Sequence, residues 1–584
     1  MKKFLLVLSL VVFVLGAFLV PVSAQDAPQG EWLGTWPYAA PGTHNLNSFA
    51  AGGLNDNLGN VYRPLVELTP AYYLWATNEY TPILAESWGF TDDNAAFEYT
   101  LKADALWSDG SPITSADVIT TFAIGRILGW AQFGFVDSVE AVDDMTVRFN
   151  FKEGLASLNA QRQILKEHVV SSANYGDLAA QALALHADGK TKDDAEWTEL
   201  STAIAEFRPE SLIVSGPYTY GLDAVNEAFM TLSWQPNSLF SSSVRFGTLK
   251  LWSGETEVTT PLVLSGELAH STNVYPPATI QAFADAGIRL TISPRGYGPV
   301  LLFNFNVPAF QDVNIRKAVA HAINREQSAL LTNGLGATGT VYFSGILDSL
   351  TPGILSEETI AGLNRYEYNL EGAASFMEAA GYTRNADGKW ADAAGATLTM
   401  EYTFPADFAD FSAAARDATA QLNDFGFDIT ERALPWQEAA QAIREGNFEL
   451  SVWSWGAGSP FAFQNMNNPV RRWNNPVLPA EQPGMSLPLQ FEYNGAEVDL
   501  NALILDVSNG LDPATLMAKA DNVAQILNDN VFYIPLNEML SVEPINEASI
   551  GGAPADGDPI YANPSNDHFL IYLILNGTLF PAGS

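Results

Sequence analysis

The sequence predicts a protein of mixed α/β (α+β) class that is built from more than one domain. The chain has 584 residues, of which 47% are hydrophobic and 11% aromatic, so it is globular and long enough for several buried cores. Short β-like pieces such as "AFEYTLK" and "TVRFNF" alternate with helical patterns between residues 61 and 151. Further helices and strands follow in mixed order, which excludes an all-α or all-β fold.

The first 24 residues have the pattern of an export signal. Lys2 and Lys3 precede an apolar run from Phe4 to Val20, and small residues follow up to Ala24. We expect residues 1–24 to be a cleaved signal peptide; because the apolar run is long, a retained anchor is the alternative. No later stretch approaches the ~20 apolar residues of a membrane span, so we expect an exported, soluble mature protein outside the cytoplasmic membrane.

Charge and cysteine content exclude several classes of function. The chain has 28 Lys and Arg against 66 Asp and Glu, a net charge of -38, and such a surface repels nucleic acid and anionic lipid. There is no cysteine, which excludes disulfides, thiol catalysis, Cys-ligated zinc and a lipid-anchored amino-terminal Cys.

Local patterns predict the first elements of the chain. Residues 25–60 are rich in Gly, Pro and Asn and predict a strand followed by a long exposed loop. In "WSDGSPITSADV" (107–118), Thr114 stands three residues before Asp117, the spacing of a capping box that starts a helix. We expect Trp107, at the start of this stretch, to be a core residue without contact to a ligand.

The later elements are predicted by helical periodicity and by their end signals. Residues 174–206 predict a helical hairpin, and "VSGPYTY" (214–220) predicts a return to a sheet. "FQDVNIRKAVAHAINREQSALLTNG" (310–334) predicts one amphipathic helix that ends at Asn333-Gly334. Two helix-then-strand units follow, around 370–381 and 411–424.

Four stretches carry a resemblance to a known family. "PILAESWGFTDDNAAFEYTLKADALWSDGSPITSADV" (82–118) is followed in the expected order by "SGPY" (215–218), "FNFNVPAFQDVNIRKAVAHAINRE" (303–326) and "FYIPL" (532–536). Over nearly the whole mature chain, the sequence resembles the extracytoplasmic solute-binding proteins of oligopeptide-type ABC importers, the bacterial extracellular solute-binding proteins of family 5. Within that family, the "WGAGSPFAF" loop looks most like those of the members that carry oligosaccharides.

The resemblance implies a two-lobed periplasmic-binding-protein fold with a hinge and an extra inserted domain. It assigns residues 25–61, 206–300 and 531–584 to lobe I, 62–205 to the inserted domain and 301–530 to lobe II. It further implies a monomer without catalytic activity or cofactor, whose partners are a small oligomeric ligand and an ABC permease of the membrane.

The resemblance also places the ligand between the lobes, against the loop "FELSVWSWGAGSPFAF" (448–463). The period of two puts Trp453 and Trp455 on one face of a strand, where both could stack on a ligand or belong to the core. Gly456 lets the backbone approach a ligand closely, so Trp455 is the preferred contact. The remaining candidates are aromatic or amide residues of the amino-terminal segment and of the second lobe: Trp36, Tyr38, Asn45, Asn47, Phe461, Phe463, Gln464, Asn465 and Trp473.

Missing acidic residues indicate the class of ligand. Peptide-binding members of the family usually carry an acid in this loop for the peptide's amino terminus, but residues 456–460 contain none, and Ala269-His270 stand where a second acid normally falls. A buried ammonium group without a carboxylate is costly. We therefore expect an extended uncharged ligand, with an oligosaccharide favoured and an oligopeptide as the alternative.

Other classes of function are less well supported. An exported glycoside hydrolase needs two carboxylates across a cleft, which the loop does not supply, and no repeat indicates a surface-layer or adhesion protein. "GLGATG" (334–339) follows a helix instead of a strand, which argues against a dinucleotide site. The six His residues lack the spacing of a metal site, and we expect neither metal nor cofactor.

Overall fold

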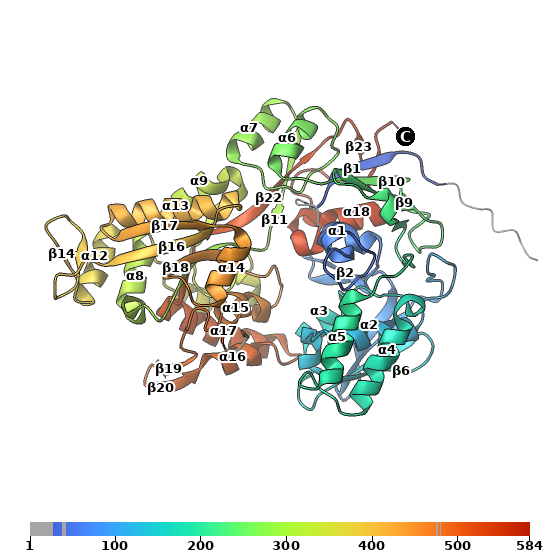
Figure 1. Cartoon of the computed structure of the whole chain (residues 1–584), viewed down its shortest axis with the longest axis horizontal. Coiled ribbons are helices and arrows are strands. Elements are labelled where there is room, and N and C mark those ends of the chain that lie inside the picture. The colour runs from blue at the N-terminus through green and yellow to red at the C-terminus, as the bar shows by residue number, and fades with distance from the viewer. Residues whose placement is uncertain (1–26, 38–42, 475–476, 479–480, 584) are drawn as a thin grey trace, which may run out of the picture.

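The computed structural model describes residues 27–37, 43–474, 477–478 and 481–583. The predicted signal peptide (1–24) and Tyr38 lie outside the described residues. Figure 1 shows two mixed α/β bodies side by side, joined by strands that run from one to the other. The predicted class and the two-lobed architecture are thus confirmed.

The first lobe contains a four-stranded sheet. The amino-terminal strand β1 pairs in parallel with β10, with Glu31 opposite Thr248, so segments more than 200 residues apart form one sheet. The strand order is β1 (Glu31–Thr35), β10 (Thr248–Trp252), β9 (Phe229–Trp234) and β8 (Tyr218–Thr219). The other main elements of the lobe are α1 (Leu54–Tyr62), α6 (Thr256–Leu264), α7 (Pro277–Asp285) and α18 (Phe569–Leu575).

A second sheet lies in the segment that follows α1, which we call the inserted domain. Its helix α2 (Ser115–Ile127) begins with the predicted capping box: the Thr114 amide donates to Asp117 Oδ2 at 2.9 Å. Trp107 is buried and donates to the same carboxylate, so its predicted core position is confirmed. The antiparallel strand order is β4 (Ala85–Phe90), β5 (Ala96–Leu101), β7 (Thr146–Phe151) and β6 (Val136–Ala141). The helices are α2, α3 (Leu158–Leu165) and the predicted hairpin α4 (Ser172–Ala187) with α5 (Ala195–Glu206).

The second lobe is built on a five-stranded sheet whose central strands are covered on both faces. Every residue of β12 (Gly298–Phe303) is buried, as expected for an interior strand. The strand order is β17 (Asp428–Leu434), β16 (Thr399–Pro405), β18 (Leu450–Trp455), β12 and β21 (Tyr533–Pro535). The main helices are α8 (Val313–Ala322), α9 (Arg325–Asn333), α12 (Leu370–Ala379), α13 (Ala409–Asp424), α14 (Trp436–Arg444), α15 (Ala462–Arg471), α16 (Leu500–Val507) and α17 (Pro513–Asn530).

Two antiparallel strands connect the lobes. β11 (Arg289–Pro294) leads into β12, and β21 leads into β22 (Asn537–Ile545), which pairs with β11. One large core lies mainly in the second lobe and extends to β21 and to Met539 of β22, whereas another is shared by the first lobe and the inserted domain. Two bodies with separate cores and two linking strands can rotate about those strands, which is the arrangement of a hinge. The exact domain boundaries stay predictions.

Two local expectations were wrong. The single helix expected over 310–334 is two helices, because Ile323 is extended and Asn324 caps α9 by accepting from the Gln327 amide; its end at Gly334 was predicted correctly. The amino-terminal loop is not exposed throughout, since residues 45–48 are buried.

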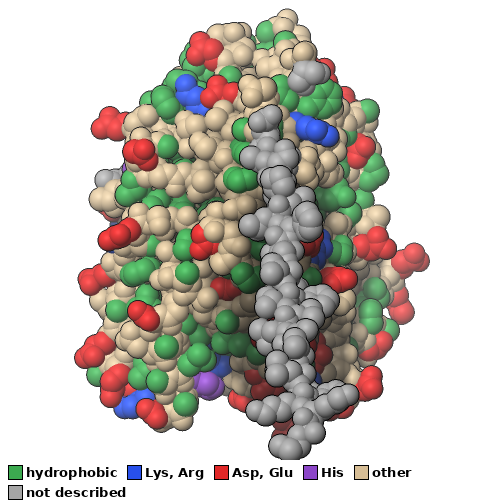
Figure 2. All heavy atoms as spheres, turned by 90° about the vertical axis from the view of Figure 1, so that its right-hand side faces the viewer, with side chains coloured by type: hydrophobic (Ala, Val, Ile, Leu, Met, Phe, Trp, Pro, Cys, Tyr) green, Lys and Arg blue, Asp and Glu red, His purple; other side chains and the backbone are tan. Residues whose placement is uncertain are grey.

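Acidic side chains are scattered over the face in Figure 2, with few basic ones. Within the described ranges, no helix is long and apolar enough to cross a membrane.

Candidate functional site

Two neighbouring cavities lie between the inserted domain and the second lobe. The first, of about 380 Å³, is bounded by α3, by residues 566–567 and by the loop 457–459 after β18; we call it the polar cavity. The second, of about 490 Å³, is bounded by β2 (Ala71–Leu74), β3 (Glu79–Pro82), α3, α15 and α17; we call it the aromatic cavity. The two lobes therefore enclose a divided cleft of the size used for small ligands.

Direct contacts bridge the lobes around these cavities. Ser157 pairs with Gly510 as a parallel β-bridge, with the Leu158 amide donating to Gly510 O and the Gly510 amide donating to Ala156 O at 3.0 Å. Gln464 Nε2 donates to Asn159 Oδ1 next to both cavities. These contacts hold the lobes together in this structure.

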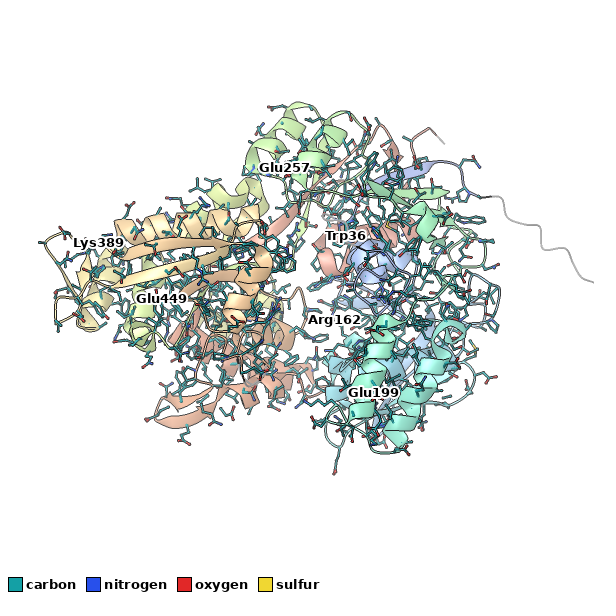
Figure 3. All side chains as sticks on the ribbon, viewed as in Figure 1. Trp36, Arg162, Glu199, Glu257, Lys389 and Glu449 are labelled. Carbon is teal, nitrogen blue, oxygen red and sulfur yellow. The ribbon has the colours of Figure 1, made fainter. Side chains whose placement is uncertain are left out.

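A buried ionic cluster forms one wall of the polar cavity. Asp567 accepts from Arg162 Nη2 and from Lys166 Nζ, each at 2.6 Å, and from Trp75 Nε1 at 2.8 Å. Burial acts to raise the pKa of Asp567, but Lys166 and Arg162 outweigh it and lower this pKa to about 2. Asp567 is thus an ionised carboxylate whose two oxygens are both occupied. Figure 3 shows Arg162 at the edge of the inserted domain that faces the second lobe.

Four buried polar atoms of α3 and the segment after it, which lie along the two cavities, have no hydrogen-bond partner in the described part of the chain. They are Asn159 Nδ2, Arg162 Nη1, Gln163 Oε1 and His168 Nε2. An unpaired buried polar group costs about 1–3 kcal/mol, so this wall is incomplete without a ligand or water.

Sequence reasoning missed this wall, although α3 carries a readable signal. Asn159, Arg162, Gln163 and Lys166 follow the spacing i, i+3, i+4, i+7, which forms one polar stripe on a helix. In the structure, Arg162, Gln163 and Lys166 of this stripe line the polar cavity, and Asn159 lines the aromatic cavity.

The next residues on this wall are also perturbed. Burial raises the pKa of Glu167 to about 7. The Arg63 charge and the hydrogen bond from the Gln132 amide act in the opposite direction but are weaker than the effect of burial. Burial and the Arg63 charge lower the pKa of His168 well below its usual value, so this imidazole is neutral.

The aromatic cavity offers ring faces from both lobes. Tyr73, Trp75 and Tyr80 come from the inserted domain, and Phe461 comes from the second lobe. Tyr73 and Tyr80 are edge to face with centroids 4.8 Å apart, and the Arg162 guanidinium lies 4.7 Å from the Tyr73 centroid. Such faces suit flat apolar ligand surfaces such as those of sugar rings.

A third cavity, of about 510 Å³, lies between α6 of the first lobe and the start of α13. Its wall includes Glu255 and Asp410. Burial, with Glu257 and Asp410 nearby, raises the pKa of Glu255, and burial likewise raises that of Asp410. The acidic groups of the cleft are thus concentrated here.

Comparison with known proteins decides the family. Residues 79–475 match the family model described as bacterial extracellular solute-binding proteins, family 5, middle region. The chain belongs to this family.

Individual relatives are distant. A putative ABC transporter peptide-binding protein of Brucella ovis is 24% identical over 348 residues, 58% of either chain, so the match spans just over half of that relative's length. A periplasmic alpha-galactoside-binding protein of Rhizobium meliloti is 21% identical, covering 71% of this chain and 62% of its own.

The fold is shared with solved structures. A periplasmic oligopeptide-binding protein of Thermotoga maritima superposes with a TM-score of 0.75 at 18% identity, covering 95% of this chain and 99% of that one. A structure of the same protein with bound mannohexaose gives a TM-score of 0.69, with 96% and 100% covered.

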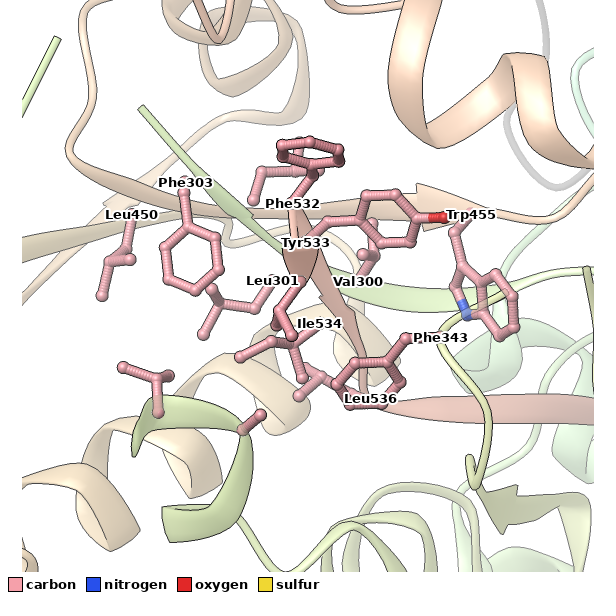
Figure 4. Close-up of a cluster of buried hydrophobic side chains, with 14 of the residues drawn as sticks. Val300, Leu301, Phe303, Phe343, Leu450, Trp455, Phe532, Tyr533, Ile534 and Leu536 are labelled. Carbon is pink, nitrogen blue, oxygen red and sulfur yellow. The ribbon is translucent and has the colours of Figure 1, made fainter. Parts of the chain in front are cut away.

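The structure of this family 5 protein places the predicted tryptophans in the core. Trp455 is fully buried, donates to Asn537 O at 3.1 Å and belongs to the cluster shown in Figure 4 with Val300 and Tyr533. Trp453 and Trp473 are buried edge to face with centroids 5.4 Å apart. None of the three has a ring face open to a ligand here, so the core interpretation is the one that this structure supports.

Gly456 packs against protein and not against a cavity. A Cβ at this position would lie 2.8 Å from Leu347 Cδ2, and the residue has φ +76°, so the glycine is needed for the turn after β18. Phe461, by contrast, is half-buried and lines the aromatic cavity, and Gln464 lines the polar one.

The amino-terminal candidates lie elsewhere. Asn47 is fully buried and donates to Ile204 O at 2.7 Å and to Phe207 O at 3.0 Å. Trp36 is half-buried, with its Nε1 donating to Asp56 O. Neither residue lines the polar or the aromatic cavity.

One cluster has the composition of a metal site: His270, Glu543 and His568, all buried in the first lobe. His568 Nδ1 accepts from the Leu570 amide, so a neutral ring carries its proton on Nε2, which donates to Glu543. His270 Nε2 lies 2.8 Å from the same carboxylate. Hydrogen bonds within the protein therefore account for these nitrogens without a metal.

Proposed function

We propose that this chain is the extracytoplasmic solute-binding component of an ABC import system. It captures an extended, uncharged oligosaccharide between its lobes and delivers it to a membrane permease. The observation that carries the proposal is the pair of adjoining interlobe cavities, one walled by aromatic rings and the other by polar atoms without partners.

The chemistry of the two cavities fits a sugar. Trp75, Tyr80 and Phe461, which are only half-buried, offer faces for the apolar sides of pyranose rings. The unpaired donors Asn159 Nδ2 and Arg162 Nη1 and the unpaired acceptor Gln163 Oε1 suit hydroxyl groups, which both donate and accept. The mannohexaose complex of the Thermotoga maritima protein and the alpha-galactoside-binding relative add support by analogy.

An oligopeptide is the alternative ligand, and the third cavity favours it. Asp410 and Glu255 could receive a peptide's amino terminus there, although no acid occurs in residues 456–460. The Brucella ovis relative is named as a peptide-binding protein.

We propose no catalysis on the bound ligand. The polar cavity does contain two carboxylates, Glu167 and Asp567, as a glycoside hydrolase would require. Asp567, however, has both oxygens bonded to Arg162, Lys166 and Trp75, so it cannot act as a nucleophile without losing these partners.

Thermal melting of the mature protein tests the ligand class. A ligand at one hundred times its Kd stabilises the folded state by ~2.7 kcal/mol, a shift that is readily measured. We expect neutral β-linked or α-galactoside oligosaccharides of two to six units to raise the Tm, and di- to pentapeptides to leave it unchanged. A shift with peptides alone would assign the protein to peptide uptake, and release of shorter sugars on incubation would make it an enzyme.

A further inference from the structure

The cationic groups of the polar cavity outnumber the acid that binds them. Arg162 and Lys166 share the single carboxylate of Asp567, so this cluster carries one positive charge in excess. The whole chain has a net charge of -38, so a locally positive cavity is unusual in this protein. It indicates an anionic group on the ligand, not a neutral one.

Neighbouring charges cancel only part of this excess. Arg63 is paired with Glu67 at 2.8 Å and is thereby neutralised. Glu167 accepts from Gln132 Nε2, and with a pKa of about 7 it is only partly ionised near neutral pH. His168 adds no charge, because its pKa is well below the usual value.

Arg162 also has a donor to spare. Its side chain is 6% exposed and uses Nη2 for Asp567, while Nη1 is buried without a partner in the described residues. The Tyr80 hydroxyl lies beside the guanidinium, whose positive charge opposes the burial that raises the Tyr80 pKa. A guanidinium with one free nitrogen next to a hydroxyl is a suitable receptor for an oxyanion.

We infer that one end of the otherwise uncharged ligand bears an anionic group, a carboxylate or a phosphate, which Arg162 and Lys166 receive. The inference rests on the proposed oligosaccharide function and changes one part of it: the sugar chain is uncharged except for a single acidic group at one end. It agrees with the missing acids near residues 456–460, because acids at that position would receive a cationic group of the ligand and not an anionic one. Opening of the lobes gives the anion access to Arg162.

Three matched probes test the inference by titration calorimetry: cellobiose, its carboxylate form cellobionate, and cellobiose 6-phosphate. We expect at least one anionic probe to bind about tenfold more tightly than cellobiose, as one charge-assisted hydrogen bond provides, with the preference weakening in salt. Anionic probes that bind no more tightly than cellobiose, whether or not cellobiose binds, overturn the inference. The comparison of the two anionic probes distinguishes a sugar acid from a sugar phosphate.

Lys166→Gln is the informative variant, because it removes the excess charge and leaves the buried Arg162–Asp567 pair intact. The preference for the anionic probe should fall from about tenfold to twofold or less, a larger change than any change in cellobiose affinity. Lys190→Gln, which removes a cation outside the cavities, should keep the full preference. An anion preference that survives in Lys166→Gln contradicts the assignment. The proposed function fails separately, if neutral sugars leave the Tm unchanged and peptides raise it.

Discussion

Ser157 and Gly510 join the inserted domain to the second lobe through a parallel β-bridge. The bridge includes the 3.0 Å bond from the Gly510 amide to Ala156 O, and Ser157 Oγ donates to Ser508 O. Because these bonds connect two bodies with separate cores, we expect them to form when the lobes close and to break when the lobes open. The bridge therefore contributes to the free energy of closure and not to either core.

Gly510→Pro tests the bridge. Proline has no amide hydrogen and cannot adopt the φ of +132° found at Gly510. The substitution therefore removes the hydrogen bond from the Gly510 amide to Ala156 O and disturbs the neighbouring bond from the Leu158 amide to Gly510 O. Each bond contributes about 0.5–1.5 kcal/mol, so we expect the Kd for the bound solute to rise about 2- to 30-fold in calorimetry, with little change in Tm. Gly557→Pro, in an exposed turn with φ +83° and open space around it, is the control. Equal affinity of the two variants would show that the bridge does not stabilise the closed form.

Phe461→Ala tests the aromatic cavity. The ring is half-buried between the lobes, and losing its stacking on a sugar should cost about 1–3 kcal/mol, or roughly a 5- to 100-fold rise in Kd. Phe580→Ala removes a ring that is 37% exposed and lines neither cavity, so its affinity should match that of the wild type. Unchanged oligosaccharide affinity in Phe461→Ala would move the site away from the aromatic cavity.

Trp455→Ala tests whether this tryptophan is a core residue. Truncating a fully buried Trp costs about 3–5 kcal/mol, so the ligand-free variant should unfold at clearly lower denaturant concentration, as should Trp107→Ala. Trp436, which is 41% exposed, supplies the control, since its truncation should change stability by less than about 1 kcal/mol. A ligand-free Trp455→Ala protein as stable as the wild type, but with weakened binding, would restore the ligand-stacking interpretation.

The pH dependence of stability reports on Glu167. Its folded-state pKa is raised to about 7, so the folded state holds this proton more tightly than the unfolded chain does. The stability that this group contributes at low pH is therefore lost as the pH rises from about 4.5 to about 7. The glutamine of Glu167→Gln does not ionise, so this variant does not lose that stability. The free energy of unfolding of the variant minus that of the wild type should therefore rise by about 1–3 kcal/mol across this window, and water in the cavity makes the rise smaller.

Urea titrations at pH 5 and pH 8 measure this difference. The exposed Glu199→Gln serves as the control and should show no change relative to the wild type between the two pH values. A Glu167→Gln difference that is constant with pH, or that falls, would contradict the assigned environment of Glu167.

Local sequence signals predicted the fold well where the structure depends on local chemistry. Thr114 and Asp117 cap α2 because capping needs only neighbours along the chain. The single helix over 310–334 was wrong because Asn324 can also act as a cap within a periodic pattern.

The site was harder to predict, because its parts come from distant segments. Arg162 and Asp567 are 405 residues apart in the sequence. The residues near α3 therefore do not indicate that Asp567 binds the polar stripe of this helix. The period of two in β18 identified neighbouring tryptophans but not their surroundings, since a strand covered on both faces has no open side. Phe461, which lines the aromatic cavity, was among the predicted residues because it lies in the loop 448–463 that the family resemblance indicated.

Hydrogen exchange of the amides of Leu158 and Gly510, and of residues 456–459 and 461–464, tests most directly whether the solute is held between the lobes. With a saturating oligosaccharide, we expect exchange at these amides to slow at least tenfold, since closure over ligand protects both the bridge and the cavity walls. Unchanged exchange at these amides, together with new protection elsewhere, would contradict the account and place the ligand outside the two cavities.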